Sequence, residues 1–330
     1  MYPRFVTRTE ADGEGALHPD GWEMRHYTIR PGAVRFTKHI LSLGEDLILE
    51  EDHLHAGSIR VDGAIGEGRL QIALLQLENH RVFGAAADGG LQVVSCNGSA
   101  WDAAGSAPAS AVTFNATELL VGKIVSRSAV ELLKARFQAE GEHRPLITPF
   151  TRQSAALETL IRVSIQRARE GAFGPDEQQT LRDDLSRVVG AVIAEIAHVA
   201  RVDVDRPTKS QHSLARAIEE ALWTWPITAD DRINLDSLAS RFVCSRRYIQ
   251  LAVSKTFGLS FTSLKRCVRL HQARRALRET TLSITDVALR HEFEHLGRFA
   301  AYYKDFFGVL PGLERSGVRL NAGSAGPVSD

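Results

Sequence analysis

The first third of the chain alternates hydrophobic and polar residues with a period of two. In the clearest run, Val34, Phe36 and Ile40 share one side of an extended segment, and Lys38 interrupts the apolar positions. This period is typical of β-strands with one buried face. Further strand candidates, separated by glycines, lie at residues 47–49, 58–61, 70–77 and 91–95. Many short strands with glycine-containing turns predict a β-sandwich or jelly-roll barrel between residues 21 and 125.

From residue 126 to residue 200 the hydrophobic period changes to that of an α-helix. The longest apolar stripe has steps of three and four residues and comprises Leu181, Leu185, Val188, Val192, Ile196 and Val199. Such a stripe can pack on the sheet of its own chain or against the same helix of a second chain. The pattern alone leaves both arrangements open.

A third pattern, helix–break–helix, occurs twice near the C-terminal end. The first unit spans residues 235–257, and the second spans residues 283–307 and is followed by Gly308 and Pro311. Ser245 is expected to cap the second helix of the first unit, as serine commonly does at a helix N-terminus. Helix-turn-helix units insert the N-terminal part of their second helix into the major groove of DNA. Two such units in tandem therefore predict a DNA-binding domain.

The expected DNA contacts follow from this geometry, because side chains after the cap of the second helix point outward. They are Ser245, Arg246, Arg247, Gln250, Lys265, Arg269, His295, Leu296, Arg298 and Lys304. An arginine can take guanine and a glutamine can take adenine, whereas Leu296 suits a thymine methyl group. Lys265 and Arg269 are expected to meet phosphate. The alternative is that the arginines contact only phosphate or solvent.

The C-terminal stretch 213–317 resembles the DNA-binding domain of the AraC/XylS family of bacterial transcription regulators. The resemblance rests on the two helix-turn-helix units and on family positions occupied here by Ala288, Phe293, Phe299, Gly308 and Pro311. Two positions depart from the family pattern, because Val243 and Glu292 stand where relatives usually have a turn glycine. Parts of both recognition helices also resemble the ethanolamine-responsive branch of the family, which implies a small polar effector.

The resemblance implies an α+β multidomain protein with four segments. These are a cupin-like effector-sensing barrel at 1–125, a helical dimerisation region and linker at 126–209, the DNA-binding domain at 213–317 and a flexible tail at 318–330. It also implies a homodimer and an activator that meets RNA polymerase. We therefore expect a transcription regulator that binds double-stranded promoter or operator DNA and responds to a small molecule.

Composition and charge agree with a separate DNA-binding domain. The chain of 330 residues has no net charge, but residues 213–317 contain 16 Lys and Arg against 11 Asp and Glu. A basic segment within a neutral chain is expected where one domain alone meets phosphates. Three cysteines without CxxC spacing predict neither disulfides nor zinc. With no signal peptide or membrane span recognised, the sequence predicts a cytoplasmic protein.

Candidate effector contacts are polar and aromatic residues in the strand region. They are Trp22, His26, Phe36, His39, His55, Gln71 and Trp101, any of which could instead fill the core. His53 and His55 would share one face of a strand, as a metal site requires, but no glutamate follows them. We therefore expect no cofactor, no metal and no enzymatic activity. The alternatives are a cupin-like metal-dependent enzyme fused to a DNA-binding module and a DNA binder that needs no effector.

Overall fold

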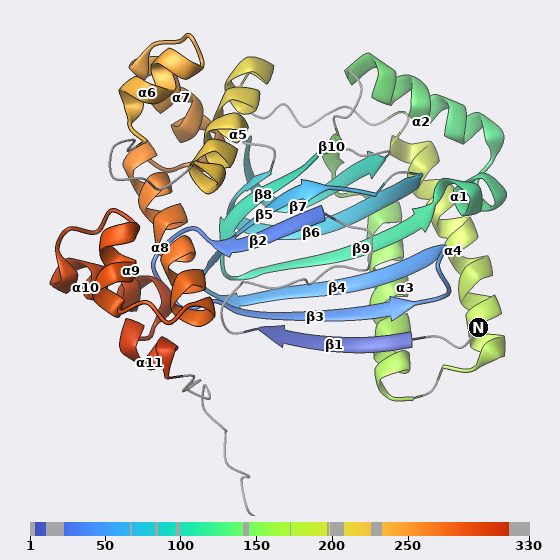
Figure 1. The fold of residues 1–330 in the computed structure, drawn as a ribbon. Helices are drawn as coiled ribbons and strands as arrows, with labels where there is room; N and C mark the ends of the chain where they lie inside the picture. Colours follow the sequence, from blue (N-terminus) through green and yellow to red (C-terminus); the bar gives the residue numbers. More distant parts are fainter. Residues whose placement is uncertain are drawn as a thin grey trace, which may run out of the picture.

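The structure is a computed structural model that joins a large β-sheet to two groups of helices (Figure 1). It describes residues 4–10, 23–66, 68–82, 85–96, 100–140, 145–171, 173–196, 198, 208–225 and 233–316. Helices α1 to α4 cover one side of the sheet, and helices α5 to α11 form a separate group at its other end. The predicted tail at 318–330, Trp22 and most of the predicted linker lie outside the described residues.

In the described ranges the sheet contains ten strands, and every strand pair is antiparallel. They are β1 (Arg4–Glu10), β2 (Glu23–Thr28), β3 (Arg35–Ser42), β4 (Leu47–Ala56), β5 (Ser58–Ala64), β6 (Arg69–Val82), β7 (Ala85–Cys96), β8 (Ala100–Ser106), β9 (Ala109–Thr117) and β10 (Leu146–Pro149). The order is β1-β3-β4-β9-β6-β8-β5-β2, with β7 pairing with both β6 and β10. Within the described ranges β1 and β2 end this path without pairing with each other. The prediction of a closed cupin-like barrel is therefore corrected to an open, folded-over sheet.

Strand alternation explains how the sheet acquires an interior. Phe36 and Lys38 point to one side of β3, and Leu41 packs with the helices on the other. The predicted interruption of the apolar positions is present, because Lys38 is only 1% exposed. The sequence pattern located β3 to β7 but not the remaining five strands. Several of these are rich in alanine, serine or charged residues, which give a weak strand signal.

Helices α1 (Glu118–Ile124), α2 (Arg127–Glu140), α3 (Arg152–Arg169) and α4 (Pro175–Ile196) enclose the larger apolar core. The apolar stripe of α4 is buried in this core, because Leu181, Leu185 and Val192 are at most 4% exposed in the single chain. They share the core with Leu157 and Leu49 from α3 and β4. Of the two arrangements left open by the sequence, the stripe adopts the one within the chain. It is therefore not a free dimerisation surface.

The C-terminal group contains seven helices in the described ranges. They are α5 (Lys209–Thr224), α6 (Leu235–Arg241), α7 (Arg246–Phe257), α8 (Phe261–Glu279), α9 (Ile284–Arg290), α10 (Leu296–Phe307) and α11 (Pro311–Arg315). Helix α8 runs between two cores, one around α5 to α7 and the other around α9 and α10. The buried faces of α7 and α8 share the first core, with Phe257 and Leu264 fully enclosed. The molecule thus presents two helix-turn-helix units on one connecting helix.

A buried ion pair joins the sheet to this helical group. Arg60 of β5 donates two hydrogen bonds to the carboxylate of Glu219 on α5, at 2.7 Å and 2.8 Å, and both side chains are at most 1% exposed. The hydroxyl of Tyr27 on β2 also donates to Glu219. Burial, followed by the charge of Glu219, raises the pKa of Tyr27 well above its usual value, so the phenol stays neutral.

A second set of contacts extends the junction to the recognition helix of the first unit and to the connecting helix α8. The Arg60 guanidinium lies 4.5 Å from the ring centre of Phe257 at the end of α7. The carbonyl oxygen of Thr28 lies 3.1 Å from the sulfur of Cys267 and 2.8 Å from Nε2 of His271, both on α8. The sheet and the helical group therefore share a buried, partly polar boundary.

The ion pair gives a prediction about stability. In the Glu219→Leu variant, buried Arg60 loses the carboxylate of Glu219, and breaking a buried ion pair in this way costs about 3–5 kcal/mol. We expect a large fall in the urea midpoint of the full chain. The Arg60→Leu/Glu219→Leu double variant should recover most of the loss, because no isolated charge is then buried.

An exposed ion pair supplies the control. Glu131 and Lys134 on α2 are each 62% exposed, and Glu131→Gln should change the free energy of unfolding by less than about 0.5 kcal/mol. A Glu219→Leu variant as stable as this control would show that the ion pair does not hold the junction together.

Candidate DNA-binding interface

Polar caps define the ends of the helices in the first unit. The Asn234 side chain accepts from the backbone N–H of Ser237 at 2.9 Å, and the Ser237 hydroxyl accepts in turn from Asn234 N–H. The Ser245 hydroxyl accepts from Tyr248 N–H at 3.1 Å and so starts α7. Gly258, in the left-handed conformation with φ of 65°, ends it. Ser245 is the cap that the sequence predicted, and a left-handed glycine is a common helix end.

The second unit repeats this construction with one difference. Ser283 and Asp286 form a reciprocal cap at the start of α9, and Gly308, with φ of 76°, ends α10. At the start of α10, however, His295 makes no side-chain cap. The first backbone N–H groups of the second recognition helix therefore receive no hydrogen bond from the His295 side chain.

The two turns have the same backbone geometry and both violate a residue preference. Val243 has a φ of 48° and Glu292 a φ of 66°, the two positive values among non-glycine residues in the described ranges. In each turn the next N–H reaches back five residues, from Cys244 to Ala239 at 3.0 Å and from Phe293 to Ala288 at 2.9 Å. This hydrogen bond requires a left-handed residue before it, which explains why glycine is expected there.

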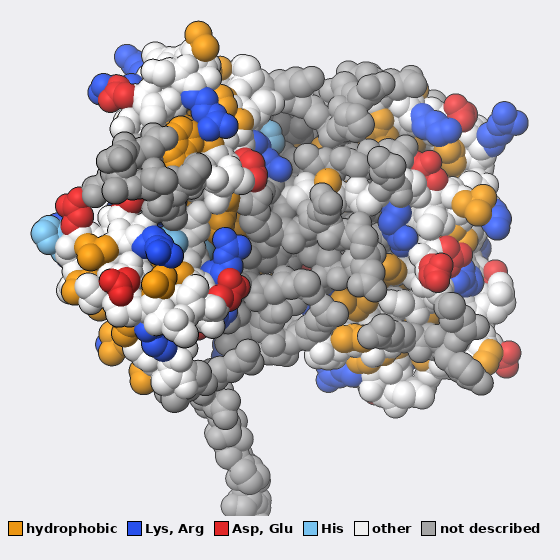
Figure 2. Space-filling model, in the orientation of Figure 1, with side chains coloured by type: hydrophobic (Ala, Val, Ile, Leu, Met, Phe, Trp, Pro, Cys, Tyr) orange, Lys and Arg blue, Asp and Glu red, His pale blue; other side chains and the backbone are white. Residues whose placement is uncertain are grey.

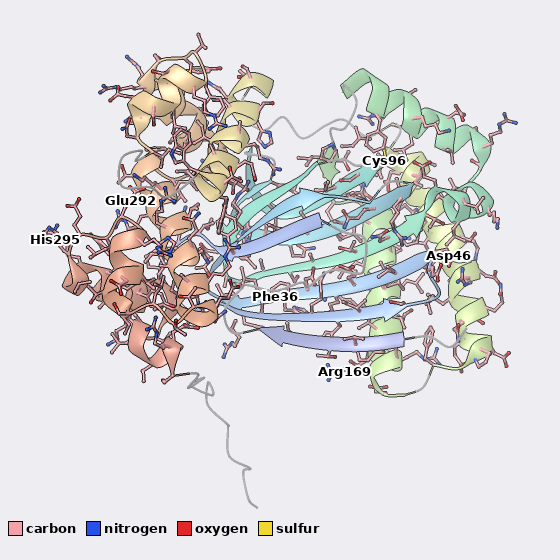
Figure 3. The ribbon with its side chains drawn as sticks, in the orientation of Figure 1. Phe36, Asp46, Cys96, Arg169, Glu292 and His295 are labelled. Carbon is pink, nitrogen blue, oxygen red and sulfur yellow. The ribbon has the colours of Figure 1, made fainter. Side chains whose placement is uncertain are left out.

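Both recognition helices expose the side chains expected to meet DNA. On α7, Ser245, Arg246, Arg247 and Gln250 are exposed, and Arg246 forms an ion pair with Asp236 of α6 in which both side chains are 63% exposed. On the second unit the exposed residues are His295, Leu296, Arg298 and Lys304. Figure 3 shows His295 at the outer edge of the helical group, away from the sheet.

Lysine and arginine side chains are dispersed over the helical group, rather than gathered in one patch, on the face shown in Figure 2. Hydrophobic and acidic side chains lie between them. The exposed cations on this face can therefore meet phosphates at separate points along a duplex.

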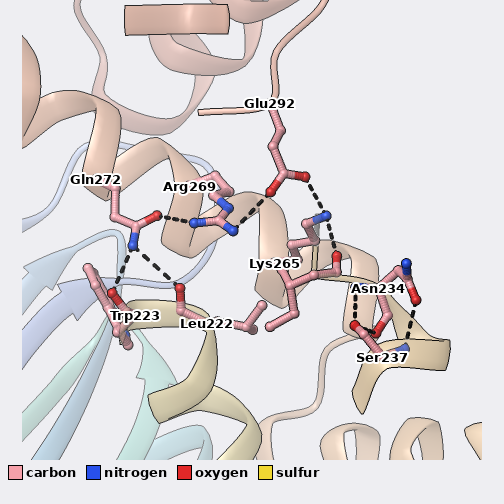
Figure 4. A network of polar contacts seen from close by, with 9 residues as sticks. Leu222, Trp223, Asn234, Ser237, Lys265, Arg269, Gln272 and Glu292 are labelled. Atoms are coloured by element: carbon pink, nitrogen blue, oxygen red, sulfur yellow. Dashed lines mark hydrogen bonds and ion pairs between the residues drawn. The ribbon is translucent and has the colours of Figure 1, made fainter. Parts of the chain in front are cut away.

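Arg269 is a correction to the predicted interface. It is 2% exposed, and its guanidinium donates to Gln272 at 2.8 Å and to Glu292 at 2.9 Å (Figure 4). Lys265 is also engaged within the protein, at 2.6 Å from the Glu292 carboxylate and 2.7 Å from the Ile233 carbonyl. Both point toward the turn of the second unit. The sequence showed a basic helix, but only the packing showed that these charges face inward.

The folded-over sheet lines a partly open cavity of about 120 Å³. Strands β3 to β6, β8 and β9 supply its walls, which are largely apolar. The polar lining consists of Lys38, Glu50, Asp52, Gln71, His80, Ser110 and Thr113.

One ionic cluster dominates the polar side of the cavity. The Lys38 ammonium lies 2.5 Å from the Glu50 carboxylate and 3.2 Å from that of Asp52. Burial opposes the charge of Lys38, but the carboxylates of Asp52 and Glu50 outweigh it and raise the lysine pKa. Burial raises the pKa of Asp52 to about 6, against the opposing effect of Lys38. The sequence pattern indicated Lys38 but not its partners, although Glu50 and Asp52 have the spacing of residues on one face of a strand.

The predicted effector contacts divide into three groups. Phe36 and Gln71 line the cavity. His39 and His55 do not, because they point from the same strands to the other side, where His39 contacts Thr7 at 3.0 Å and His55 contacts Thr37 at 3.1 Å. Their assignment is corrected by strand alternation. The third group, Trp22, His26 and Trp101, has side chains outside the described part of the structure.

His53 and His55 are stacked with ring centres 5.8 Å apart, and His53 pairs with Glu51 at 3.1 Å. Within the described ranges, no three or more His, Cys, Asp or Glu side chains are grouped so that they could hold a metal ion. None of the helices described here combines the length and apolar character needed to cross a membrane.

Comparison with known proteins identifies the C-terminal helices. A family model described as a helix-turn-helix domain matches residues 238–316. The XylDLEGF operon transcriptional activator 2 of Pseudomonas putida is 38% identical over 82 residues, 24% of this chain and 52% of that protein. The transcriptional activator AarP of Providencia stuartii is 28% identical over 85 residues, 26% of this chain and 63% of that protein. The chain thus spans less than two thirds of the length of these relatives.

Solved structures also match this chain. A probable AraC family transcriptional regulator from Rhodopseudomonas palustris is 28% identical, covering 32% of this chain and 98% of that one, with a TM-score of 0.30. ToxT from Vibrio cholerae covers 81% of this chain and 97% of its own, at 9% identity and a TM-score of 0.29. These TM-scores are too low to establish a common arrangement of the whole chain.

The tandem units, their caps and the sequence matches define the class of this region. The C-terminal domain is a helix-turn-helix domain of the AraC/XylS family. It follows an N-terminal domain built on a β-sheet.

Val243 gives a prediction about the first turn. A left-handed conformation costs a non-glycine residue about 1–2 kcal/mol, and Val243 is 91% exposed, so that little packing is lost on its removal. Val243→Gly should therefore stabilise α6 and α7 by about 0.5–1 kcal/mol after the entropy of glycine is subtracted. Native-state hydrogen exchange of their amides measures this change. Val243→Ala retains a Cβ and should give no comparable gain.

The same substitution in the second turn should have the opposite sign. Glu292→Gly also relieves a left-handed residue, but it removes the carboxylate that pairs with Arg269 and Lys265. Leaving buried Arg269 unpaired costs more than the strain releases, and we expect a net loss of about 2–4 kcal/mol by denaturant titration. A gain in stability similar to that of Val243→Gly would show that the ion pairs contribute little.

Proposed function

We propose that this protein is a sequence-specific DNA-binding transcription regulator whose N-terminal sheet domain binds a small molecule. The observation that carries the proposal is the pair of capped recognition helices, α7 and α10, which expose Arg247, Gln250 and Arg298 while burying their opposite faces. In helix-turn-helix proteins this exposed surface meets the bases and phosphates of the major groove.

Within α7, the polar side chains suit direct recognition of bases. Ser245 fixes the helix start, and Arg247 and Gln250 follow it on the exposed side. A guanidinium can donate two hydrogen bonds to guanine, and a glutamine amide can pair with adenine. Arg246, held against Asp236, and the exposed Lys304 of α10 are suited to phosphate.

The cavity supports a response to a small molecule, because its walls also hold the DNA-binding domain. Ile59 and Val61 of β5 line the cavity, whereas Arg60 between them reaches Glu219 and Phe257 on the other side. The same alternation occurs on β6, where His80 and Val82 line the cavity. Between them, Arg81 donates to the Lys255 carbonyl of α7 at 2.8 Å. A ligand that shifts either strand acts directly on the helices that meet DNA, provided that it binds the two arrangements with different affinity.

The cavity chemistry favours an effector that donates hydrogen bonds. Glu50 and Gln71 are at most 4% exposed, and within the described ranges Glu50 Oε1 and Gln71 Oε1 accept no hydrogen bond. Lys38 is already balanced by two carboxylates, which disfavours an added anion. The volume of about 120 Å³ suits only a few non-hydrogen atoms, since a cavity of about 150 Å³ accommodates benzene.

Activation and dimerisation are further parts of the proposal. Relatives of the C-terminal domain are named transcriptional activators, which favours activation through contact with RNA polymerase. A dimer would place four helix-turn-helix units on an operator. Since the apolar stripe of α4 is used within the chain, the pairing surface must involve other residues. The competing interpretation as a fused cupin-like enzyme has less support, because the named relatives are regulators.

Arg247→Ala tests the proposal. Loss of a guanidinium that contacts a base should weaken binding to a selected operator by about 1–3 kcal/mol and relax its preference at one or two base pairs. Electrophoretic mobility shifts with the operator and with scrambled DNA measure both effects.

The matched control is Lys134→Ala, which removes an exposed charge on α2, far from the recognition helices in sequence. It should leave operator affinity unchanged. Equal behaviour of the Arg247 and Lys134 variants would exclude Arg247 from the interface, and failure of the full chain to prefer any sequence would overturn the proposed function.

A further inference from the structure

The two recognition helices can be aligned residue for residue in sequence. Each has twelve residues and is followed by a left-handed glycine, Gly258 or Gly308. Four of their buried positions also correspond, among them Ile249 with Phe299 and Phe257 with Phe307. A comparison of the opposite, exposed faces therefore compares equivalent places in the two units.

The outward rows of the two helices carry different chemistry. Residues two, six and nine of each helix lie opposite its buried face, because each residue advances the helix by about 100°. On α7 this row is Arg247, Leu251 and Ser254, and on α10 it is Gly297, Ala301 and Lys304, all of them exposed. The position that Arg247 occupies in the first unit is thus occupied by Gly297 in the second.

No structural requirement in the described residues accounts for Gly297. Its φ is not positive, and a Cβ built there would meet nothing within 4 Å. In the middle of a helix, glycine is less stable than alanine by about 0.5–1 kcal/mol, and Gly297 lies in the first turn of α10. What glycine does supply is room for another molecule to approach the backbone closely.

We propose that α10 enters the major groove closely enough for Ala301 to contact the 5-methyl group of thymine, whereas α7 reads polar base edges through Arg247 and Gln250. This inference rests on the proposed DNA-binding function and names the base chemistry recognised by each helix. Methyl groups distinguish thymine from cytosine in the major groove, and alanine is a suitable apolar partner. The segment of DNA bound by one chain is then asymmetric, with a methyl-dependent half under α10.

Replacement of thymine by uracil tests this directly, because uracil lacks only the methyl group. The full chain is first used to select a site from random double-stranded DNA, and each thymine of the site is then changed to deoxyuridine. We expect one or more substitutions in one half of the site to weaken binding about fourfold, the effect of one buried methyl group.

Ala301→Gly assigns the effect to α10. This variant lacks the methyl partner, so it should bind thymine and uracil sites with equal affinity, whereas Arg247→Ala should retain the discrimination. A merely structural role of Ala301 would weaken both sites alike and keep their ratio, which overturns the inference.

Gly297→Arg supplies a second, independent variant. The open space around Gly297 accommodates the side chain, and Gly297→Ala controls for the change in helix propensity. The arginine should weaken binding to the selected site at least tenfold, and reselection should yield a guanine in that half. Unchanged DNA binding combined with lost activation would make α10 a protein-docking surface and overturn the inference.

The outcomes separate the two levels of the argument. If selection enriches no sequence, the proposed function itself fails. If a site is enriched but uracil substitutions in both halves leave affinity unchanged, only the methyl-reading inference fails.

Discussion

The buried ion pair between Arg60 and Glu219 is the interaction on which the arrangement of the two domains depends. A guanidinium and a carboxylate that are both buried must remain together, since separating them would leave each charge unpaired in an apolar environment. Tyr27 and the ring of Phe257 complete the enclosure. The pair couples a strand of the cavity wall to the first helix of the DNA-binding domain. Any rearrangement must move it intact or expose it to solvent.

A second constraint acts within the DNA-binding domain, where each turn needs a left-handed residue and neither has a glycine. The first turn bears the strain on an exposed valine. In the second, Glu292 adopts the unfavourable left-handed conformation, and its carboxylate lies between Lys265 and Arg269. The connecting helix α8 is thereby fastened to the second unit. Similar backbones are thus maintained by different means, one local and one dependent on ion pairs.

Sequence reasoning located the helical domain well because its signals are local. Caps such as Asn234 and Ser245 and the stop at Gly308 lie within a few residues of what they control. The sheet was harder, because pairing among ten strands joins distant segments and alanine-rich strands such as β8 carry little pattern. The partners of Lys38, and the inward direction of Arg269, depend on packing that no local window contains.

The inward-facing arginines of α8 also change what the domain's charge means for DNA. Arg269 and Arg274 are at most 4% exposed. Arg269 and Lys265 form ion pairs with Glu292, and Arg274 forms one with Glu314. Counting basic residues therefore overstates how many condensed counterions this domain displaces from a duplex. Its affinity should depend on ionic strength less steeply than its composition suggests. More of the binding free energy must then come from shape and base contacts.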